Sequence, residues 1–361
     1  MILPALTMLL WFAGWIVLGR VRQCRAVAGQ TVGADQLSIV IPARNEEHNL
    51  PTLLGSLTAQ AVKPREIIVV DDASTDRTTE VARQFGARVI AAQPLPDGWR
   101  GKAWACQQGA QAATGITLLF LDADTRFEPD GLRRALAEFA ALDGGVLSVA
   151  PHHAVRQFYE HFSVFFNLVM FAASTAFTLL GTRLTARGLF GPFVLIRRAD
   201  YDRVGGFAAV KGRILETFYF AGQLRSAGVA LHCRSGRGAF SIRMYPHGWR
   251  DLVEGWTRGF ASGAGETPPA MLLLIIAWMT GLMIPLMGLA IGGAPLLWLT
   301  LYALGVAQVG WLMSRVGTFR LLTALLYPAP LIFYFAIFAR SFLRSRNKQK
   351  VEWKGRKIRA D

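Results

Sequence analysis

Two aspartates stand one residue apart where an apolar run ends. The stretch ITLLFLDADTRFEPDGL, residues 116–132, places Asp122 and Asp124 directly after its apolar residues. One interpretation is a plain turn, because Asp is favoured where strands end and a Pro-Asp-Gly follows here. The other is a divalent metal held beside a phosphate, because hard cations take oxygen ligands and bind nucleotides through a few carboxylates. This stretch alone leaves both interpretations open.

The chain around the two aspartates alternates between expected strands and helices. Short apolar, β-branched runs predict strands at 37–43, 66–72, 87–92 and 116–122. Helix-like stretches lie between them at 45–60, 74–86 and 101–115. In the second of these, Ser74 or Thr75 is the expected N-cap and Gly86 the expected C-cap. Alternation at this spacing predicts an α/β domain with parallel strands and helical crossovers.

Polar residues follow three of these strands. They form PARNEE at 42–47, DDASTD at 71–76 and DADTR at 122–126. Parallel sheets bind ligands at the carboxyl ends of their strands, so the three clusters are expected to meet. This convergence favours the metal interpretation of Asp122 and Asp124 over the turn.

The same segments resemble a known family. SIVIPARNEEHNLPTLLGSL, EIIVVDDASTDRTTEVA and LLFLDADTRFEPDGL are similar to the nucleotide-sugar half of the family 2 glycosyltransferases, in the expected order across about 37–140. The resemblance implies the GT-A fold, a Rossmann-like nucleotide-diphospho-sugar transferase domain. Three further segments, FGPFVLIRRADYDRVGGF, SIRMYPHGWRDLVEGWTRGFASGAG and VEWKGR, resemble a narrower branch, the membrane glycosyltransferases that act on carotenoid carboxylic acids. That resemblance covers nearly the whole chain.

The resemblance implies roles for the residues at the strand ends. The first loop would bind the base and ribose through Pro42, Ala43, Arg44 and Glu46. In the second loop, Asp71 and Asp72 would accept hydrogen bonds from uracil or ribose. Lys102, in WRGKAWA, would approach the diphosphate, with a solvated lysine as the alternative. Asp122 would reach the ribose or the metal, and Asp124 would ligate the metal. The ion, Mg²⁺ or Mn²⁺, would offset charge on the leaving diphosphate. Glu46 and Glu47 also fit a helix first turn, where acids complement the helix dipole.

The acceptor side departs from the family pattern. Inverting members usually carry a Glu-Asp pair beyond the metal motif, whereas RILETFYFAGQL has Glu216 followed by Thr217. A carboxylic acid acceptor is already ionised near neutral pH, because its reference pKa is about 4. Loss of the second acid therefore fits an acid acceptor, and Glu216 is expected to serve the acceptor site, the alternative being a helix cap. EGWTRGF replaces the processive QxxRW motif, which implies transfer of a single sugar, with UDP-glucose as the expected donor.

Composition indicates a membrane protein in a reducing compartment. Of the 361 residues, 52% are hydrophobic, and the formal charge is +15. A basic chain fits either nucleic acid or an anionic membrane surface. No nucleic-acid motif occurs, and the basic residues flank apolar segments. The three cysteines, Cys24, Cys106 and Cys233, match no metal or redox spacing.

Hydropathy predicts membrane segments at both ends of the chain. Residues 1–20 are expected to form an N-terminal anchor rather than a signal peptide, and the arginines that follow place the next segment in the cytoplasm. The expected organisation continues with a GT-A domain at 30–265, divided into a nucleotide-sugar half at 30–140 and an acceptor half with interfacial helices at 141–265, then membrane helices at 271–340 and a basic cytoplasmic tail at 341–361.

A cytoplasmic tail requires that one apolar segment does not cross the membrane. The candidate spans are 271–292, 294–313 and 321–339. The last contains Pro328 and Pro330, which would break a helix, so we expect it not to cross. The protein would then be a multi-pass protein of the cell membrane, with its catalytic domain on the cytoplasmic face.

Two stretches indicate a lipid acceptor. FSVFFNLVMFAASTAFTLLG, 162–181, is apolar enough to span, but one crossing would separate Asp124 from Glu216. It is therefore expected to be buried, interfacial or re-entrant. In WRDLVEGWTRGF an apolar helical stripe suits a bilayer surface. Its members are Trp249, Leu252, Val253, Trp256 and Phe260. Core packing is the alternative for both stretches.

Other functions fit parts of the sequence. LLFLDADTR also resembles a haloacid-dehalogenase phosphatase box with Asp122 as nucleophile, but Arg126 stands where that box needs Thr or Val. Hopanoid or polyprenyl lipids are alternative acceptors. A non-catalytic scaffold on a decayed transferase fold is a further alternative, opposed by the intact Asp122 and Asp124 and kept open by Thr217.

Overall fold

A computed structural model describes residues 2–25, 33–181, 186–213, 216–258, 266–346, 351–353 and 356–358. Contacts within the chain divide it into two compact units. The sheet unit comprises Arg22–His152 and Thr185–Arg243, and the helical unit comprises Met1–Val21, His153–Leu184 and Met244–Asp361. All of the expected site residues belong to the sheet unit.

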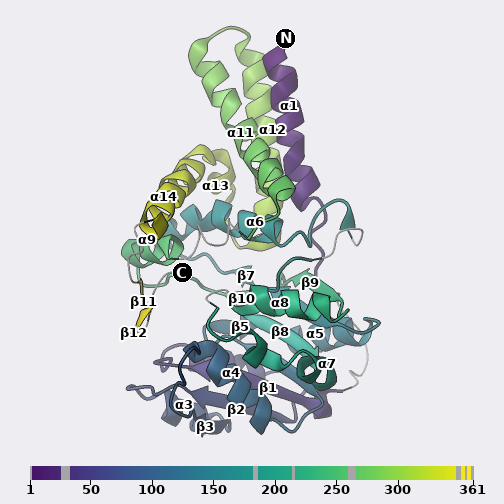
Figure 1. Cartoon of the computed structure of the whole chain (residues 1–361). Coiled ribbons are helices and arrows are strands. Elements are labelled where there is room, and N and C mark those ends of the chain that lie inside the picture. Colours follow the sequence, from purple (N-terminus) through teal and green to yellow (C-terminus); the bar gives the residue numbers. More distant parts are fainter. Residues whose placement is uncertain are drawn as a thin grey trace. The chain divides into compact units, whose positions relative to one another are not determined.

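A mixed seven-stranded sheet forms the centre of the sheet unit (Figure 1). Its strand order is β3-β2-β1-β4-β8-β6-β9. The first four strands of this order are parallel, as predicted, whereas β8 is antiparallel to both of its neighbours. The strands are β1 (Leu37–Ala43), β2 (Glu66–Asp71), β3 (Arg88–Ala91), β4 (Thr117–Leu121), β6 (Val146–Ala150), β8 (Phe193–Arg197) and β9 (Leu231–Ser235).

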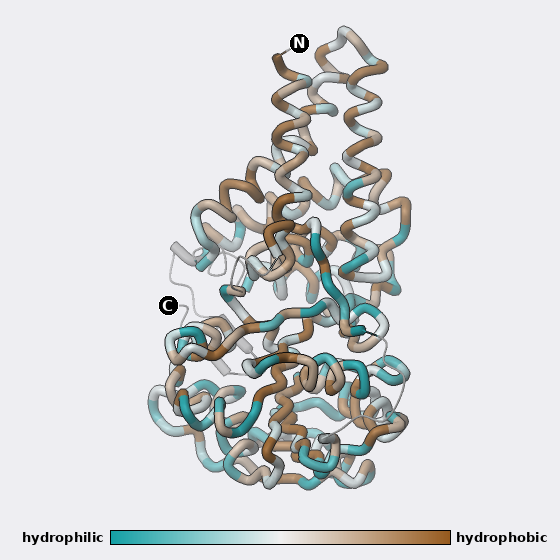
Figure 2. The backbone as a smooth tube through the Cα atoms, turned by 90° about the vertical axis from the view of Figure 1, so that its right-hand side faces the viewer, coloured by the Kyte–Doolittle hydropathy of each residue, from teal (hydrophilic) through white to brown (hydrophobic). Residues whose placement is uncertain are grey.

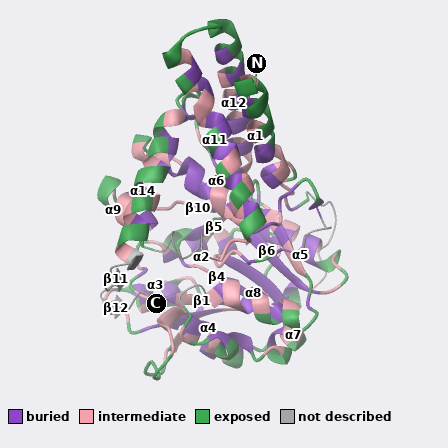
Figure 3. Cartoon of the chain, turned by 45° about the horizontal axis from the view of Figure 1, so that its top comes forward, coloured by how far each residue is buried: buried purple, intermediate pink, exposed green. Residues whose placement is uncertain are grey.

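Helices cover both faces of this sheet. α2, α3 and α5 contribute to one hydrophobic cluster, and α4, α7, η4 and α8 contribute to the other. Successive residues of β1 alternate between them, since Ile39 and Ile41 join the first cluster and Val40 the second. Strands buried on both faces are typical of a sheet with helical crossovers, and Figure 3 shows the buried residues concentrated there. The remaining elements of the unit are η1 (Ala34–Gln36), α2 (Leu50–Thr58), α3 (Thr78–Gln84), α4 (Gly101–Ala112), β5 (Thr125–Phe127), α5 (Gly131–Ala140), α7 (Arg198–Arg203), η4 (Gly206–Val210), α8 (Glu216–Ser226) and β10 (Phe240–Ile242).

The predicted strands agree with the observed ones to within one residue at each end, but two helix starts are wrong. α2 begins at Leu50 rather than at residue 45, so Glu46 and Glu47 do not lie in a helix first turn. α3 begins at Thr78 after Arg77, not after Ser74 or Thr75. Those two residues instead make hydrogen bonds with Asn45 of the loop after β1. Ser74 and Thr75 therefore bond to a neighbouring loop and do not cap the helix. Gly86, the expected C-cap, lies one residue past the C-cap in a left-handed conformation.

The helical unit combines long apolar helices with shorter ones (Figure 2). Two of the described helices, α11 and α12, are long and apolar enough to cross a membrane. α1 is also apolar but has only 17 residues. The elements are α1 (Ile2–Leu18), η2 (Phe158–Ser163), α6 (Val164–Ala173), α9 (Trp249–Thr257), α11 (Pro269–Ile291), α12 (Pro295–Val316), α13 (Leu321–Leu325), α14 (Pro328–Arg346), β11 (Val351–Trp353) and β12 (Arg356–Ile358), with the two-residue β7 (His152–His153) where the chain passes between the units.

A buried polar contact joins α1, α11 and α12. Trp278 Nε1 of α11 donates to Gln308 Oε1 of α12 at 2.8 Å, and Gln308 Nε2 donates to the carbonyl of Trp11 in α1 at 3.2 Å. Trp278 is fully buried. Because a polar group inside an apolar bundle is costly unless it is hydrogen-bonded, this contact fixes the alignment of the three helices.

The segment 321–339 is broken, as predicted from its prolines. α13 ends at Leu325, and α14 begins at Pro328. α14 lies beside α9, at an angle to the three-helix bundle (Figure 1). Glu254 of α9 accepts hydrogen bonds from Arg340 and Arg344 of α14. Whether 321–339 crosses a membrane stays a prediction.

Residues 162–181 and the α9 stripe are partly packed inside the helical unit. Residues 162–181 do not form one long helix, because α6 ends at Ala173, and Phe165 and Phe166 are fully buried. Leu252 and Trp256 of the expected surface stripe are also buried, and Trp256 stacks on Phe166. A bilayer-facing role is therefore wrong for these two. Trp249 is exposed, and Phe260 lies outside the described residues.

The close packing of α1 on α11 predicts a position-specific loss of stability. A Cβ on Gly281 would lie 2.6 Å from the backbone nitrogen of Trp11. Gly281→Ala should therefore destabilise the bundle, by about 1–3 kcal/mol for overpacking. At Gly310 of α12, an added Cβ would meet only Ala324 Cβ at 3.6 Å. Gly310→Ala is the control and should be neutral or stabilising. Thermal unfolding in detergent measures both, and equal midpoints would contradict this packing.

Candidate functional site

The carboxyl ends of β1, β2 and β4 lie side by side at one edge of the sheet. Ala43, the last residue of β1, is in register with Asp71, the last residue of β2. β4 pairs with the other side of β1 and ends one residue before Asp122. The three polar clusters therefore meet, as the strand order requires.

Hydrogen bonds interlock the loops after β1 and β2. Asn45 N donates to Ser74 Oγ at 2.9 Å, and Thr75 N donates to Asn45 Oδ1 at 2.9 Å. Arg44 Nη1 donates to the carbonyl oxygen of Asp72 at 2.7 Å. Asn45 and Ala73 both have positive φ, 53° and 55°. Non-glycine residues in this region are uncommon and need support from their surroundings, which the interlock supplies.

The acids of these loops are held in place individually. Glu46 is buried, its N–H donates to Thr78 Oγ1 at 2.8 Å, and its carboxylate accepts from Asn49 Nδ2 at 2.7 Å. Asp71 Oδ1 accepts from Ser74 N at 3.2 Å. Asp72 is buried, and its N–H donates to the carbonyl of Ala43 at 2.8 Å. The loop expected to hold the nucleoside is thus rigidly built.

Asp122 and Asp124 occupy the turn after β4. Asp122 N donates to the carbonyl of Pro192, and Asp122 O accepts from Thr125 Oγ1 at 2.6 Å. Asp124 keeps part of its surface exposed to solvent. The protein packed around its carboxyl group removes some hydration, and the negative charges of Asp122 and Glu46 add to this, so the pKa of Asp124 is raised to about 7. Asp122 and Asp124 are therefore both residues of a turn and members of an acidic cluster, so the two interpretations of this stretch do not exclude each other.

Lys102 joins this turn to the acceptor side. It is the second residue of α4, and its Nζ lies 2.5 Å from Asp122 Oδ1 and 3.8 Å from Glu216 Oε1. Burial acts to lower the pKa of Lys102, but the charges of the two carboxylates outweigh it and raise that pKa above its usual range. Lys102 is therefore not the freely solvated lysine of the alternative interpretation.

Glu216 begins α8 and faces Lys102 across the site. Burial raises the pKa of its carboxyl group, and the charge of Lys102 opposes this rise. Thr217 follows it and is largely buried. The chain thus places one ammonium between the acids of the expected metal motif and the acid of the expected acceptor site.

Sequence reasoning missed two contributors. Gly191 lies against the site, since a Cβ built there would come within 3.1 Å of Thr217 Oγ1 and 3.4 Å of Lys102 Nζ. The FGPF segment that contains Gly191 was noted only as part of the resemblance to the carotenoid-acid glycosyltransferases. Asn45 connects the loop after β1 with the loop after β2. In the sequence, only its position directly before Glu46 pointed to it.

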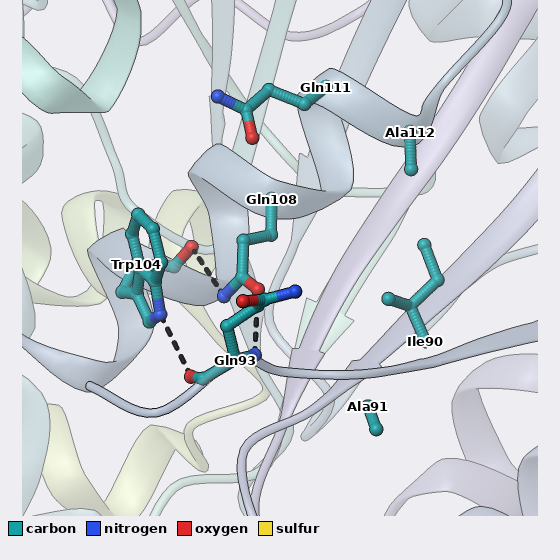
Figure 4. A pocket seen from close by; sticks show the side chains of 7 residues that line it. All are labelled: Ile90, Ala91, Gln93, Trp104, Gln108, Gln111 and Ala112. Atoms are coloured by element: carbon teal, nitrogen blue, oxygen red, sulfur yellow. Dashed lines mark hydrogen bonds between the residues drawn. The ribbon is translucent and has the colours of Figure 1, made fainter. Parts of the chain in front are cut away.

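A cavity of about 470 Å³ lies elsewhere on the sheet unit, between β3 and α4 (Figure 4). None of its lining residues carries a charge, and hydrogen bonds join Gln93, Trp104 and Gln108. Trp104 Nε1 donates to the carbonyl of Gln93, and Gln93 N donates to Gln108 Oε1. No residue predicted for the site lines this cavity, and its uncharged walls do not suit a diphosphate.

The acids present fit a divalent ion that shares its coordination with a ligand. Among the residues that the structure describes, no three His, Cys, Asp or Glu side chains are close enough to form a complete metal site. Mg²⁺ usually binds through one or two carboxylates together with phosphates and waters. Asp122 and Asp124 supply that number, and the crowded negative charge around Asp124 favours a cation.

Comparison with known proteins agrees with this fold. The family model described as Glycosyl transferase family 2 matches residues 38–205. That range contains Asp122 and Asp124, which favours a transferase over the phosphatase interpretation. The mannosyltransferase PcManGT from Pyrobaculum calidifontis, solved in complex with GDP-Man and Mn²⁺, is similar in fold, with a TM-score of 0.53 and 18% identity over 95% of this chain and 98% of that one.

Two curated relatives match nearly the full length. A 4,4'-diaponeurosporenoate glycosyltransferase of Staphylococcus aureus strain MRSA252 is 36% identical over 331 residues, 89% of this chain and 87% of the relative. The protein of the same description from strain USA300 is 35% identical over 328 residues, with the same coverage. With the mixed GT-A sheet and the acidic turn after β4, these matches show that the chain is an enzyme belonging to family 2 of the glycosyltransferases.

Proposed function

We propose that this enzyme moves one sugar, glucose, from UDP-glucose to the carboxylate of a membrane-bound carotenoid acid. An oxygen of the acceptor carboxylate attacks the anomeric carbon from the face opposite the leaving group, and the configuration inverts. The bond from that carbon to the diphosphate breaks, and its electron pair leaves with the diphosphate. The products are a glycosyl ester and UDP. The observation that carries the proposal is the Lys102 ammonium, which lies between Asp122 and Glu216.

The interlocked loops support the donor half of the proposal. Pro42, Ala43, Arg44 and Glu46 would hold the base and ribose, and Asp71 and Asp72 would accept hydrogen bonds from them. Such loops bind without reorganising, because their own hydrogen bonds are already made. Lys102 would approach the diphosphate from α4.

The acidic turn supports a metal-assisted leaving group. Asp124 would ligate Mg²⁺ or Mn²⁺ directly, and Asp122 would reach the ion or the ribose. When bound, such an ion offsets the negative charge that builds on the departing diphosphate. The Mn²⁺ in the solved mannosyltransferase complex agrees with this expectation.

The acceptor is inferred from Glu216, Thr217 and the full-length relatives. Those relatives are named for a carotenoid acid. An ionised acid needs no proton removed, so no enzyme base is required, and Glu216 would act by holding Lys102 in place. Such an acceptor lies in a membrane, and the apolar α11 and α12 would anchor the enzyme there. Residues 30–265 would lie on the cytoplasmic side, with α1, α11 and α12 crossing and 321–339 not crossing.

The metal assignment predicts a large effect from an isosteric change. Asp124→Asn should lower transfer of glucose about 100-fold or more, the scale of losing one preorganised electrostatic contact. Asp143→Asn, a change at an exposed acid of the same unit, is the control and should leave transfer unchanged. UDP release by membranes that contain each variant, with and without chelator, measures this. Full activity of Asp124→Asn, or of wild type in chelator, would refute the metal site.

The acceptor assignment predicts a flat pH profile. Glu216 has a raised pKa, so a base at this position would become protonated, and the rate would fall, as the pH drops through that pKa. With an acceptor that is already ionised, transfer at saturating Mn²⁺ should stay nearly constant from about pH 6 to 8. Glu216→Gln should cost about tenfold or less through lost positioning. A steep loss toward pH 6 together with a loss of several orders in Glu216→Gln would make Glu216 the base and contradict an acid acceptor.

The topology predicts opposite labelling of two introduced cysteines. In a background without Cys24, Cys106 and Cys233, which are all buried, His48→Cys should resist a membrane-impermeant thiol reagent in intact cells and react after lysis. The side chain of His48 is 86% exposed, so access is limited by the membrane alone. Ile291→Cys, where α11 ends, should react in intact cells. The reverse pattern would invert the proposed orientation.

A further inference from the structure

The ammonium of Lys102 has more N–H donors than its contacts within the protein use. It is within hydrogen-bond distance of Asp122 Oδ1 at 2.5 Å, whereas Glu216 Oε1 lies farther away at 3.8 Å. A lysine ammonium carries three N–H donors. The side chain also keeps 28% of its surface open to solvent. Lys102 can therefore take one further anionic partner.

The hydroxyl of Thr217 faces the same place. A Cβ built on Gly191 would lie 3.1 Å from Thr217 Oγ1 and 3.4 Å from Lys102 Nζ, so both groups converge on a position where no side chain stands. Thr217 is largely buried. Its hydroxyl carries one O–H donor, and a ligand at this position can accept a hydrogen bond from it.

We propose that Lys102 Nζ and Thr217 Oγ1 form a receptor for the acceptor's carboxylate beside Gly191. This inference rests on the proposed function and deepens it, because it names the side chains that distinguish an acid from an alcohol. The carboxylate accepts one hydrogen bond from each donor and keeps a lone pair for the anomeric carbon. Hydrogen bonds between ionised groups are the stronger kind, so the receptor selects an ionised acceptor.

The surrounding charges are compatible with one more anion. Lys102 and Arg100 each place a positive charge near Glu216. A side chain at position 191 would crowd both donors. The diphosphate of the donor is a second possible partner for Lys102. Separate Michaelis constants for the donor and the acceptor show which substrate each side chain contacts.

The test is a pair of variants at Thr217, measured on the full chain in lipid nanodiscs. The probes are UDP-glucose and 4,4'-diaponeurosporenoic acid. Thr217→Val removes the hydroxyl at constant size and should raise the KM for the acid about tenfold while leaving the KM for UDP-glucose unchanged. Thr217→Ser keeps the hydroxyl and should stay near the wild-type acceptor KM. A purely structural role would move neither constant selectively.

A second pair tests the charge. Thr217→Asp places a carboxylate in the receptor and should lower transfer to the acid about 100-fold or more, because like charges repel and the site is filled. Thr217→Asn has nearly the same size without the charge and should lose much less. Lys102→Met should raise the KM for the acid. If it raises only the KM for UDP-glucose, Lys102 serves the diphosphate alone and the receptor is wrong.

The outcomes separate the inference from the function on which it rests. Gln223→Ala, an exposed change on α8, is the control and should match wild type in activity and unfolding midpoint. Absence of transfer to the acid by wild type would overturn the proposed function and the receptor together. Normal wild-type transfer, with an unchanged acceptor KM in Thr217→Val and equal losses in Thr217→Asp and Thr217→Asn, would overturn the receptor alone.

Discussion

One ammonium group connects three parts of the sheet unit that are far apart in the sequence. Lys102 begins α4, Asp122 follows β4 and Glu216 begins α8, yet the first contacts the second at 2.5 Å and lies 3.8 Å from the third. A charge in a largely enclosed place needs an opposite charge, because it has lost hydration. The acids need the lysine for the same reason. This mutual requirement fixes the distance between the turn after β4 and the start of α8. On the proposed function these are the donor and acceptor sides, and a transferase depends on that distance because both substrates must meet at one carbon.

The sequence was most informative where structure is local. The strands up to 122 could be predicted closely because each is an apolar run bounded by turn residues, and their meeting at one edge follows from parallel order. Ser74 and Thr75 were misread because their capping signal is local, whereas their actual partner, Asn45, is in another loop. The contacts of Lys102 with Asp122 and Glu216 could not be predicted, since no spacing rule relates α4 to α8. Gly191 was missed because its role lies in the side chain it lacks.

The helical unit shows why hydropathy alone was ambiguous there. A helix buried on all sides and a helix facing lipid have the same apolar composition, so 162–181 and the Trp249–Trp256 stripe could be read either way. Packing partners decide the question, since Trp256 stacks on Phe166 inside the unit and its Nε1 donates to Ser163. Gln308 looks out of place in an apolar helix until its two partners, Trp278 and Trp11, are known. Polar residues within apolar helices are therefore better guides to helix contacts than the apolar residues around them.

The acceptor chemistry depends on whether the carboxylate at the reacting centre belongs to the enzyme or to the substrate. An alcohol acceptor must lose a proton, so the enzyme has to supply a carboxylate base beside the nucleophile. A carboxylic acid brings that negative charge with it, and a second enzyme carboxylate at the same place would repel it. With threonine at position 217, Lys102 faces the two acids Asp122 and Glu216 and retains a donor for a third. The third acid can then come from the substrate. On the proposed function, the sheet and its loops would hold the donor, and threonine rather than aspartate after Glu216 would turn a site for a base into a site for an anion.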